Sequence, residues 1–124
     1  AELVGQGVTG DFSFKHLWIG TSEGLNVMDK RTGEIKKYKA PYLSNNVVSA
    51  LCVTRDNTVW VGTDNGLCRY VAEKDTFVVC GDDFGDSRLR YVTIKSLLED
   101  SDVILHPQIK WKYIRKSMTN ILLM

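Results

Sequence analysis

The chain of 124 residues has three cysteines, two histidines and no long apolar run, and each of these features excludes some classes of protein. Its three cysteines are Cys52, Cys68 and Cys80. An odd number at these spacings fits neither a disulfide framework nor a zinc motif. Because Cys52 and Cys68 lie in apolar, strand-like stretches, we expect buried free thiols.

Neither basic nor acidic residues are in clear excess. The formal net charge is +1 at pH 7, which predicts no general affinity for nucleic acid or an acidic membrane. No apolar run approaches the roughly 20 residues of a membrane span, and the opening AELVGQG has no signal-peptide pattern. Apolar residues make up 44% and charged residues 25%, which is typical of a folded globular chain.

What the chain does have is an internal repeat. The stretch LWIGTSEGL at residues 17–25 returns as VWVGTDNGL at residues 59–67, which is 42 residues later. A period of this length is typical of propeller blades or of helical arrays. Short segments rich in β-branched and aromatic residues, separated by turn signals, favour blades.

The second copy predicts one four-stranded antiparallel sheet over residues 47–80. The first copy predicts a blade over residues 8–40, with its poorly matching first strand within residues 8–14. A third repeat starts at residues 89–102. We therefore predict an all-β fold over residues 1–102: a partial β-propeller of about two four-stranded antiparallel blades plus the start of a third.

Ten residues carry the repeated motif, and we expect structural roles for them: Trp18, Gly20, Thr21, Gly24, Leu25, Trp60, Gly62, Thr63, Gly66 and Leu67. The tryptophans are expected between neighbouring sheets. Each glycine after the branched residue is expected where backbone approaches backbone, and each threonine is expected to bond turn amides. The DNG at residues 64–66 predicts a primed turn with positive φ at Asn65 and Gly66.

The tail, residues 103–124, departs from the repeat. It carries four basic residues and no acidic one, whereas residues 73–102 carry eight acidic and four basic residues. We expect either out-of-frame translation after Asp102 or a genuine capping segment. IKWKYI at residues 109–114 suits an edge strand. A helix is the alternative, because one helical face would hold Trp111, Ile114, Met118, Ile121 and Leu122.

The stretch at residues 17–70, with its W-[IV]-G-T-x-x-G-L core and its L-S-N-N-x-V segment, resembles the two-component regulator propeller repeats. Those repeats form the sensor region of hybrid histidine kinases of Bacteroidetes. The resemblance covers residues 16–80 strongly and residues 81–102 moderately. It implies a periplasmic, many-bladed propeller that senses carbohydrate breakdown products and signals to an intracellular kinase.

The resemblance implies no catalysis by this chain, since it has no phospho-acceptor helix and no glycine-rich ATP lid. His16, expected in a turn before the tryptophan motif, and His106, before Pro107, do not look like phosphorylation sites. The family's ligand sites lie between propellers and following domains, so no ligand residue is carried over. We predict no catalytic, cofactor or metal residue, and an oligosaccharide ligand for the parent protein.

Two other functions stay open. A propeller-type polysaccharide lyase or glycosidase needs paired carboxylates or a Tyr/His set near the central channel. The densest acidic cluster is Asp82, Asp83 and Asp86, whose spacing fits no calcium loop. A carbohydrate-binding module would use exposed aromatic platforms, for which the candidates are Tyr38, Tyr42 and Tyr91.

Two blades cannot close a ring, because propellers typically have about four to eight. An open pair is expected to leave two apolar sheet faces uncovered, each of several hundred Å² in order of magnitude. We therefore predict self-association through these faces, with no nucleic-acid partner and no membrane contact by this chain.

Overall fold

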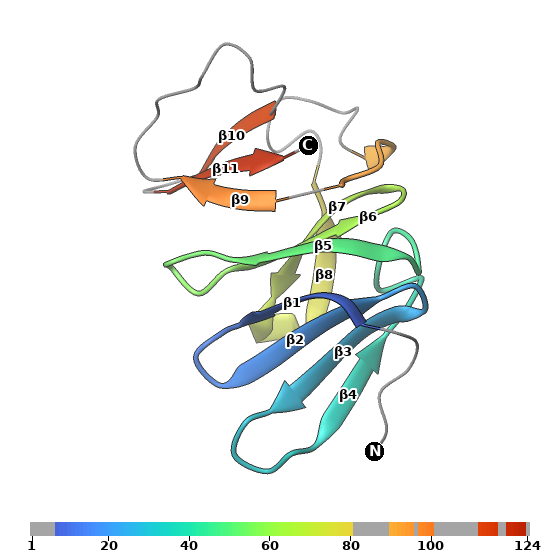
Figure 1. The fold of residues 1–124 in the computed structure, drawn as a ribbon, viewed down its shortest axis with the longest axis vertical. Helices are drawn as coiled ribbons and strands as arrows, with labels where there is room; N and C mark the ends of the chain where they lie inside the picture. The colour runs from blue at the N-terminus through green and yellow to red at the C-terminus, as the bar shows by residue number, and fades with distance from the viewer. Residues whose placement is uncertain (1–6, 81–89, 96, 101–111, 117–118, 124) are drawn as a thin grey trace.

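A computed structural model describes residues 7–80, 90–95, 97–100, 112–116 and 119–123. Three antiparallel sheets follow one another along the long axis (Figure 1). The first sheet has the strand order β1 (Gly7–Phe12), β2 (His16–Thr21), β3 (Gly24–Asp29), β4 (Ile35–Tyr38). The second has the order β5 (Val48–Val53), β6 (Val59–Thr63), β7 (Gly66–Val71), β8 (Thr76–Val79), with the 3-10 helix η1 (Ala72–Lys74) before β8. The third has the order β10 (Lys112–Lys116), β11 (Thr119–Leu123), β9 (Leu97–Asp100).

The predicted fold class is confirmed: the chain is all-β, with two four-stranded antiparallel sheets in the arrangement of propeller blades. The two sheets share a register, since Trp18 pairs with Val27 and Trp60 pairs with Arg69. The first strand expected within residues 8–14 is β1. Its register shifts near its start, as that of β5 does.

The two sheets pack through an apolar core. Trp18 is 2% exposed and lies in one cluster with Leu25, Val61 and Phe77, and so with side chains of both sheets. Its ring meets the Tyr70 ring edge-on at a centroid distance of 5.0 Å. This is the position between sheets that the repeat predicts, and burying such a ring contributes a few kcal/mol.

Trp60 repeats this arrangement one sheet later. It is 1% exposed and shares a second cluster with Leu67 and Ile94, against which Leu97 of β9 packs. The face of the second sheet that we expected to be uncovered is therefore covered at Trp60 by the segment that follows residue 90. That expectation was wrong here, because residues 94 and 97 supply the apolar cover.

Gly20 and Gly62 make room for side chains and not for backbone, which corrects the prediction. A Cβ on Gly20 would lie 2.5 Å from Val48 Cγ1 and 2.7 Å from Thr9 Cγ2. A Cβ on Gly62 would lie 2.5 Å from Ile94 Cγ2. Gly20 thus accepts the side chain of Val48 at the start of β5, and Gly62 accepts that of Ile94, which lies before β9.

The turns after β2 and β6 are held by threonine side chains. The Thr63 hydroxyl donates to the Gly66 carbonyl at 2.8 Å and accepts from the Asn65 N–H at 3.0 Å, and Thr21 bonds Gly24 and Glu23 in the same way. Gly24 and Gly66 have φ of 119° and 111°, whereas Asn65 does not have positive φ. The predicted primed turn is therefore wrong, because the glycine lies after the two turn residues and pairs with the threonine.

The tail forms strands where it is described. Lys112–Lys116 pairs with Thr119–Leu123, which in turn pairs with Leu97–Asp100. The helical alternative is wrong for these residues. β10 lies at the edge of its sheet, as an alternating apolar and basic segment predicts, while residues 109–111 lie outside the described residues.

Candidate functional site

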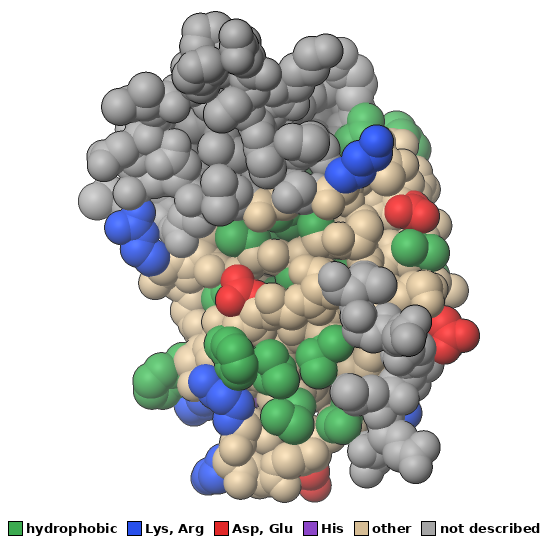
Figure 2. Space-filling model, in the orientation of Figure 1, with side chains coloured by type: hydrophobic (Ala, Val, Ile, Leu, Met, Phe, Trp, Pro, Cys, Tyr) green, Lys and Arg blue, Asp and Glu red, His purple; other side chains and the backbone are tan. Residues whose placement is uncertain are grey.

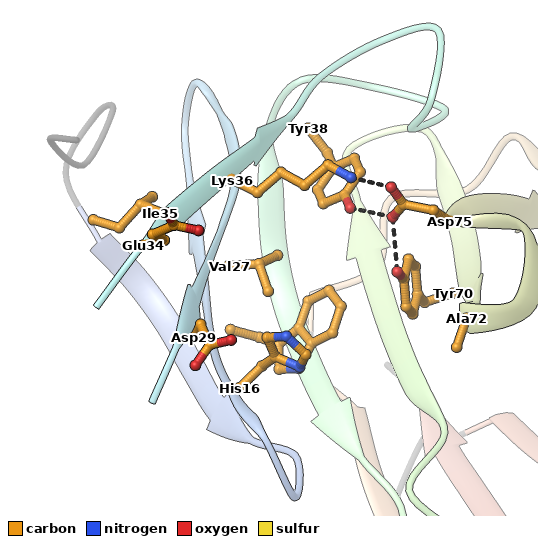
Figure 3. A pocket seen from close by; sticks show the side chains of 11 residues that line it. His16, Val27, Asp29, Glu34, Ile35, Lys36, Tyr38, Tyr70, Ala72 and Asp75 are labelled. Carbon is orange, nitrogen blue, oxygen red and sulfur yellow. Dashed lines mark hydrogen bonds and ion pairs between the residues drawn. The ribbon is translucent and has the colours of Figure 1, made fainter. Parts of the chain in front are cut away.

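A cavity of about 590 Å³ lies between the first and the second sheet. Side chains of β2, β3 and β4 form one wall, and the end of β7 with the turn at η1 forms the other (Figure 3). The lining residues are His16, Trp18, Val27, Asp29, Glu34, Ile35, Lys36, Tyr38, Tyr70, Ala72 and Asp75.

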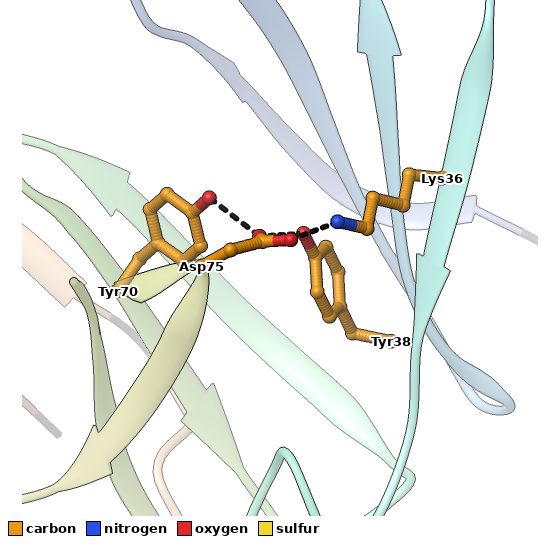
Figure 4. A network of polar contacts seen from close by, with 4 residues as sticks. All are labelled: Lys36, Tyr38, Tyr70 and Asp75. Carbon is orange, nitrogen blue, oxygen red and sulfur yellow. Dashed lines mark hydrogen bonds and ion pairs between the residues drawn. The ribbon is translucent and has the colours of Figure 1, made fainter. Parts of the chain in front are cut away.

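Asp75 is the centre of a polar network that joins the two sheets (Figure 4). Its carboxylate pairs with the Lys36 ammonium and accepts hydrogen bonds from the hydroxyls of Tyr38 and Tyr70, the latter at 2.8 Å. Asp75 has φ of 48° directly after η1, and this left-handed conformation ends the helix. Because Lys36 and Tyr38 belong to β4, the network connects the edge of the first sheet to the second.

The pKa values follow from these contacts. Hydrogen bonds from Lys36 and from the two tyrosines lower the pKa of Asp75 to about 2. The bond to Asp75 raises the pKa of Lys36. Burial, followed by the bond to Asp75, raises the pKa of both Tyr38 and Tyr70. At neutral pH the network therefore holds one carboxylate, one ammonium and two neutral phenols.

His16, Asp29 and Glu34 form the other end of the cavity. His16 and Asp29 are cross-strand partners on neighbouring strands. The Asp29 carboxylate accepts from the Arg31 N–H at 2.8 Å and from the Thr32 N–H at 3.1 Å, and these bonds lower its pKa. The cavity thus combines aromatic walls with hydrogen-bond acceptors at one end and a bridged ion pair at the other.

This polar lining does not repeat. Shifted by the 42-residue period, His16, Asp29 and Lys36 correspond to Thr58, Val71 and Val78 of the second sheet. Trp18, in contrast, corresponds to Trp60, and both are buried in apolar clusters, at 2% and 1% exposure. The fold therefore needs the tryptophan and does not need the charged lining, so this lining is the candidate functional site.

The residues singled out from the sequence lie in different places. Tyr38 is only 5% exposed, which corrects its assignment as an exposed platform, because β8 and Tyr70 cover it. Tyr42 and Tyr91 are 55% and 74% exposed. His16 lies in β2 and not in a turn. Asp82, Asp83, Asp86 and His106 lie outside the described residues.

Cys52, Cys68 and Cys80 are buried and form no disulfide. Burial raises the pKa of Cys68, whose thiol lies 3.3 Å from the Ser44 hydroxyl. Within the part of the chain that the structure describes, no three His, Cys, Asp or Glu side chains are grouped as metal ligands. Likewise, no helix among the described residues is long and apolar enough to cross a membrane.

Sequence reasoning missed Lys36, Tyr70 and Asp75 as members of one site. Lys36 and Asp75 are 39 positions apart, and each lies in a segment that reads as an ordinary strand or turn. The available signal was the comparison of repeat-equivalent positions, since Lys36 stands where the second copy has Val78.

Comparison with known proteins explains the repeat. Residues 42–65 match the family model described as Two component regulator propeller. That segment is similar to a two component regulator propeller repeat. The match begins before β5 and ends after β6, so one family repeat includes the link between two sheets. The resemblance stated from the sequence is confirmed.

Two solved structures of the extracellular domain of BT4673 from B. thetaiotaomicron are similar to the chain. One, described as a one component system, has 27% identity and a TM-score of 0.69 over 81% of this chain and 14% of that chain. The other, described as a hybrid two component system, has 26% identity and a TM-score of 0.61 over 74% of this chain and 12% of that chain. The chain thus spans about one seventh of these relatives. No curated protein matches it.

The chain therefore resembles part of the sensor propeller of a hybrid two-component system. The region to which it is similar is extracellular in that relative.

Proposed function

We propose that the chain is a non-catalytic part of the periplasmic sensor propeller of a hybrid two-component histidine kinase and that it responds to a carbohydrate-type ligand. The observation that carries the proposal is the propeller repeat at residues 42–65, within a chain that matches an extracellular sensor domain over 81% of its length.

The cavity between the two sheets supports a ligand-binding role. Its volume of about 590 Å³ falls within the range of about 300–1,000 Å³ that is usual for small-molecule sites. Rings of Trp18, Tyr38 and Tyr70 line it, and of these the half-buried Tyr70 ring is the one that could contact the carbon–hydrogen face of a sugar. His16 and Glu34 add hydrogen-bonding groups that suit hydroxyls.

The network at Asp75 supports a role in transmission. A ligand between the sheets would change the spacing that the bonds from Lys36 and Tyr38 to Asp75 hold. Because packed sheets move as rigid bodies, such a change would pass along the propeller as a small rotation of one blade against the next.

The test is thermal unfolding of the chain with a panel of neutral and acidic oligosaccharides. A ligand at about 100 times its Kd stabilises the folded state by about 2.7 kcal/mol, so we expect at least one to raise the Tm by about 10 °C. His16→Thr, which installs the residue of position 58, should reduce the rise. Lys37→Ala, which alters an exposed lysine of β4 that does not line the cavity, should leave the rise unchanged.

Three results would contradict the proposal or part of it. If no oligosaccharide of the panel changes the Tm, the proposed carbohydrate-type ligand is rejected. New reducing or unsaturated sugar ends during incubation would support the lyase or glycosidase alternative. Binding without any change in the bonds at Asp75 would instead favour a plain carbohydrate-binding module.

A further inference from the structure

The turn between β6 and β7 contains an asparagine followed by a glycine. Asn65 is exposed, whereas Gly66 is buried and has φ of 111°. In such a pair the glycine nitrogen can attack the asparagine side-chain carbonyl, because glycine has no Cβ to hinder the approach. The equivalent pair of the first sheet, Glu23 and Gly24, has no side-chain amide to lose. This chemistry is therefore open to one of the two repeated turns.

Residues 92–94 form a strap over this turn (orange, at the right of Figure 1). The Gly66 N–H donates to the Val92 carbonyl at 2.7 Å, and the Ile94 N–H donates to the Thr63 carbonyl at 2.9 Å. The nitrogen that would attack the asparagine is therefore held by the strap.

The strap has a buried inner side and an exposed outer side. Ile94 is fully buried in the cluster of Trp60 and Leu67, while Val92 is 38% exposed and Tyr91, which precedes the strap, is 74% exposed. Figure 2 shows hydrophobic and basic side chains facing solvent at the upper right of the molecule. Because solvent reaches its outer side, the strap can open locally while the second sheet stays folded. Trp60 then loses the cover that Ile94 provides.

We propose that the Asn65–Gly66 peptide is a modification site whose conversion to isoaspartate releases the strap from the turn. The Gly66 nitrogen forms a bond to Asn65 Cγ, the Cγ–Nδ2 bond breaks, and the amide group leaves as ammonia with the proton of the Gly66 N–H. Water then opens the imide ring at either carbonyl and yields aspartate or isoaspartate. The imide has no N–H for the Val92 carbonyl, and isoaspartate moves a side-chain carbon into the backbone and displaces that N–H. Neither form keeps the bond that holds the strap.

The strap and the modification oppose each other. While the strap is bound, the attacking nitrogen is engaged, and once the strap leaves, the imide can close. Isoaspartate does not return to asparagine in water, so modified copies accumulate with time. The turn is thus a slow, irreversible switch for the cover of Trp60.

The experiment follows residue 65 in the whole chain at mildly alkaline pH. Trypsin releases the peptide of residues 56–69, in which the modification adds about 1 Da, and chromatography separates isoaspartate from aspartate. We expect the folded chain to react about fivefold more slowly than the same peptide free in solution, since one backbone hydrogen bond must break first. Ile94→Ala, which removes the buried anchor of the strap, should restore most of that rate.

Three controls accompany this measurement. Asn57 lies in the same peptide and should stay unmodified over the same period, because the β-branched Thr58 follows it. Val27→Ala opens the core between the first and second sheets and should not change the rate, which separates release of the strap from a general loss of stability. Thr93→Val is a milder strap variant that removes only the hydroxyl bond to the Asp64 carbonyl at 3.0 Å, and it should raise the rate about twofold.

The consequence for packing is measured on the thiols. Cys52 and Cys80 belong to the cluster that holds Ile94, whereas Cys68 belongs to the cluster between the first and second sheets. In chains that carry isoaspartate, Cys52 and Cys80 should react with a thiol reagent and Cys68 should not. Asn65→Asp adds the charge but keeps the normal backbone, so all three thiols should stay protected.

Three outcomes would overturn the inference. Equal rates in the folded chain and in the free peptide would show that the strap does not restrain the nitrogen. Equal acceleration by Val27→Ala and Ile94→Ala would attribute the reaction to general unfolding. Unreactive Cys52 and Cys80 in the isoaspartate form would show that the strap stays in place after the modification.

Discussion

Gly20 gives the most direct test of how the two sheets pack. Alanine at this position would bring its Cβ to 2.5 Å from Val48 Cγ1 and 2.7 Å from Thr9 Cγ2. Val48 is fully buried, so it cannot swing into solvent. Adding a methyl group to a filled core typically costs about 1–3 kcal/mol. We therefore expect Gly20→Ala to lower the free energy of unfolding by about 2 kcal/mol, which is about 8 °C in Tm.

A double-mutant cycle separates this clash from any general destabilisation caused by alanine in the strand. Val48→Ala removes the Cγ1 and leaves two close neighbours of the new methyl, the Cβ of residue 48 at 3.2 Å and Thr9 Cγ2 at 2.7 Å. Alone it should cost about 2 kcal/mol, from lost burial and the space left behind. Together the two changes should cost clearly less than their sum, with a coupling of about 1–2 kcal/mol.

The assay is urea unfolding followed by tryptophan fluorescence, because Trp18 lies in the same core as Val48. Additive costs within about 0.5 kcal/mol would refute the reasoning, since they would mean that residues 20 and 48 do not share the space. Gly62→Ala should behave alike, but rescue by Ile94→Ala should be weaker. There the Cβ of Ile94 itself would lie 2.8 Å from the new methyl.

Three further predictions concern the network, the thiols and assembly. The pKa of Asp75 is about 2 when folded and 3.8 ordinarily, so its contribution is present above pH 4 and is lost as the pH falls toward 2. The full pKa shift corresponds to about 2.4 kcal/mol. Because the Asp75 side chain is 45% exposed, we expect it to contribute about 1 kcal/mol to the free energy of unfolding. When unfolding is measured as the pH is lowered, Asp75→Asn should not show this loss of stability. Cys52, Cys68 and Cys80 are buried and should react with a thiol reagent only after unfolding; rapid labelling of the folded chain would contradict this. The outer face of the first sheet carries Leu17 and Ile19, which correspond to the buried Val59 and Val61 of the second sheet. We therefore expect copies of the chain to associate through this face. Light scattering should show an average mass that rises with protein concentration, and Ile19→Lys should lower that mass.

The repeated part of the fold could be predicted because its residues interact within one short segment of the chain. Trp18, Thr21 and Gly24 form one strand and its turn, and their copies at positions 60, 63 and 66 do the same. The turn type was misjudged because a threonine hydroxyl bonded to two backbone groups decides it. The tail could not be settled by periodicity, since its strand form depends on pairing of β11 with the distant β9.

The candidate site could not be predicted in the same way, because no short segment contains it. Asp75 meets Lys36 and Tyr38 only because β4 ends beside the turn of the next sheet. The separation of 39 residues between Lys36 and Asp75 is close to the repeat period. This follows because β4 of the first sheet lies beside the turn before β8, its counterpart in the second sheet. Opposite charges separated by nearly one repeat, as Lys36 and Asp75 are, form the pattern that could have indicated the network.

The repeat also separates structural from functional residues without any second sequence. Where the two copies agree, as at Trp18 and Trp60, the residue fills the space between sheets. Where they differ in charge or ring, as at His16 and Thr58, the second copy demonstrates that the sheet forms without the feature. Substituting one copy's residue into the other should therefore alter binding and leave stability nearly unchanged. A loss of stability beyond about 1 kcal/mol in His16→Thr would mean that this side chain serves packing after all.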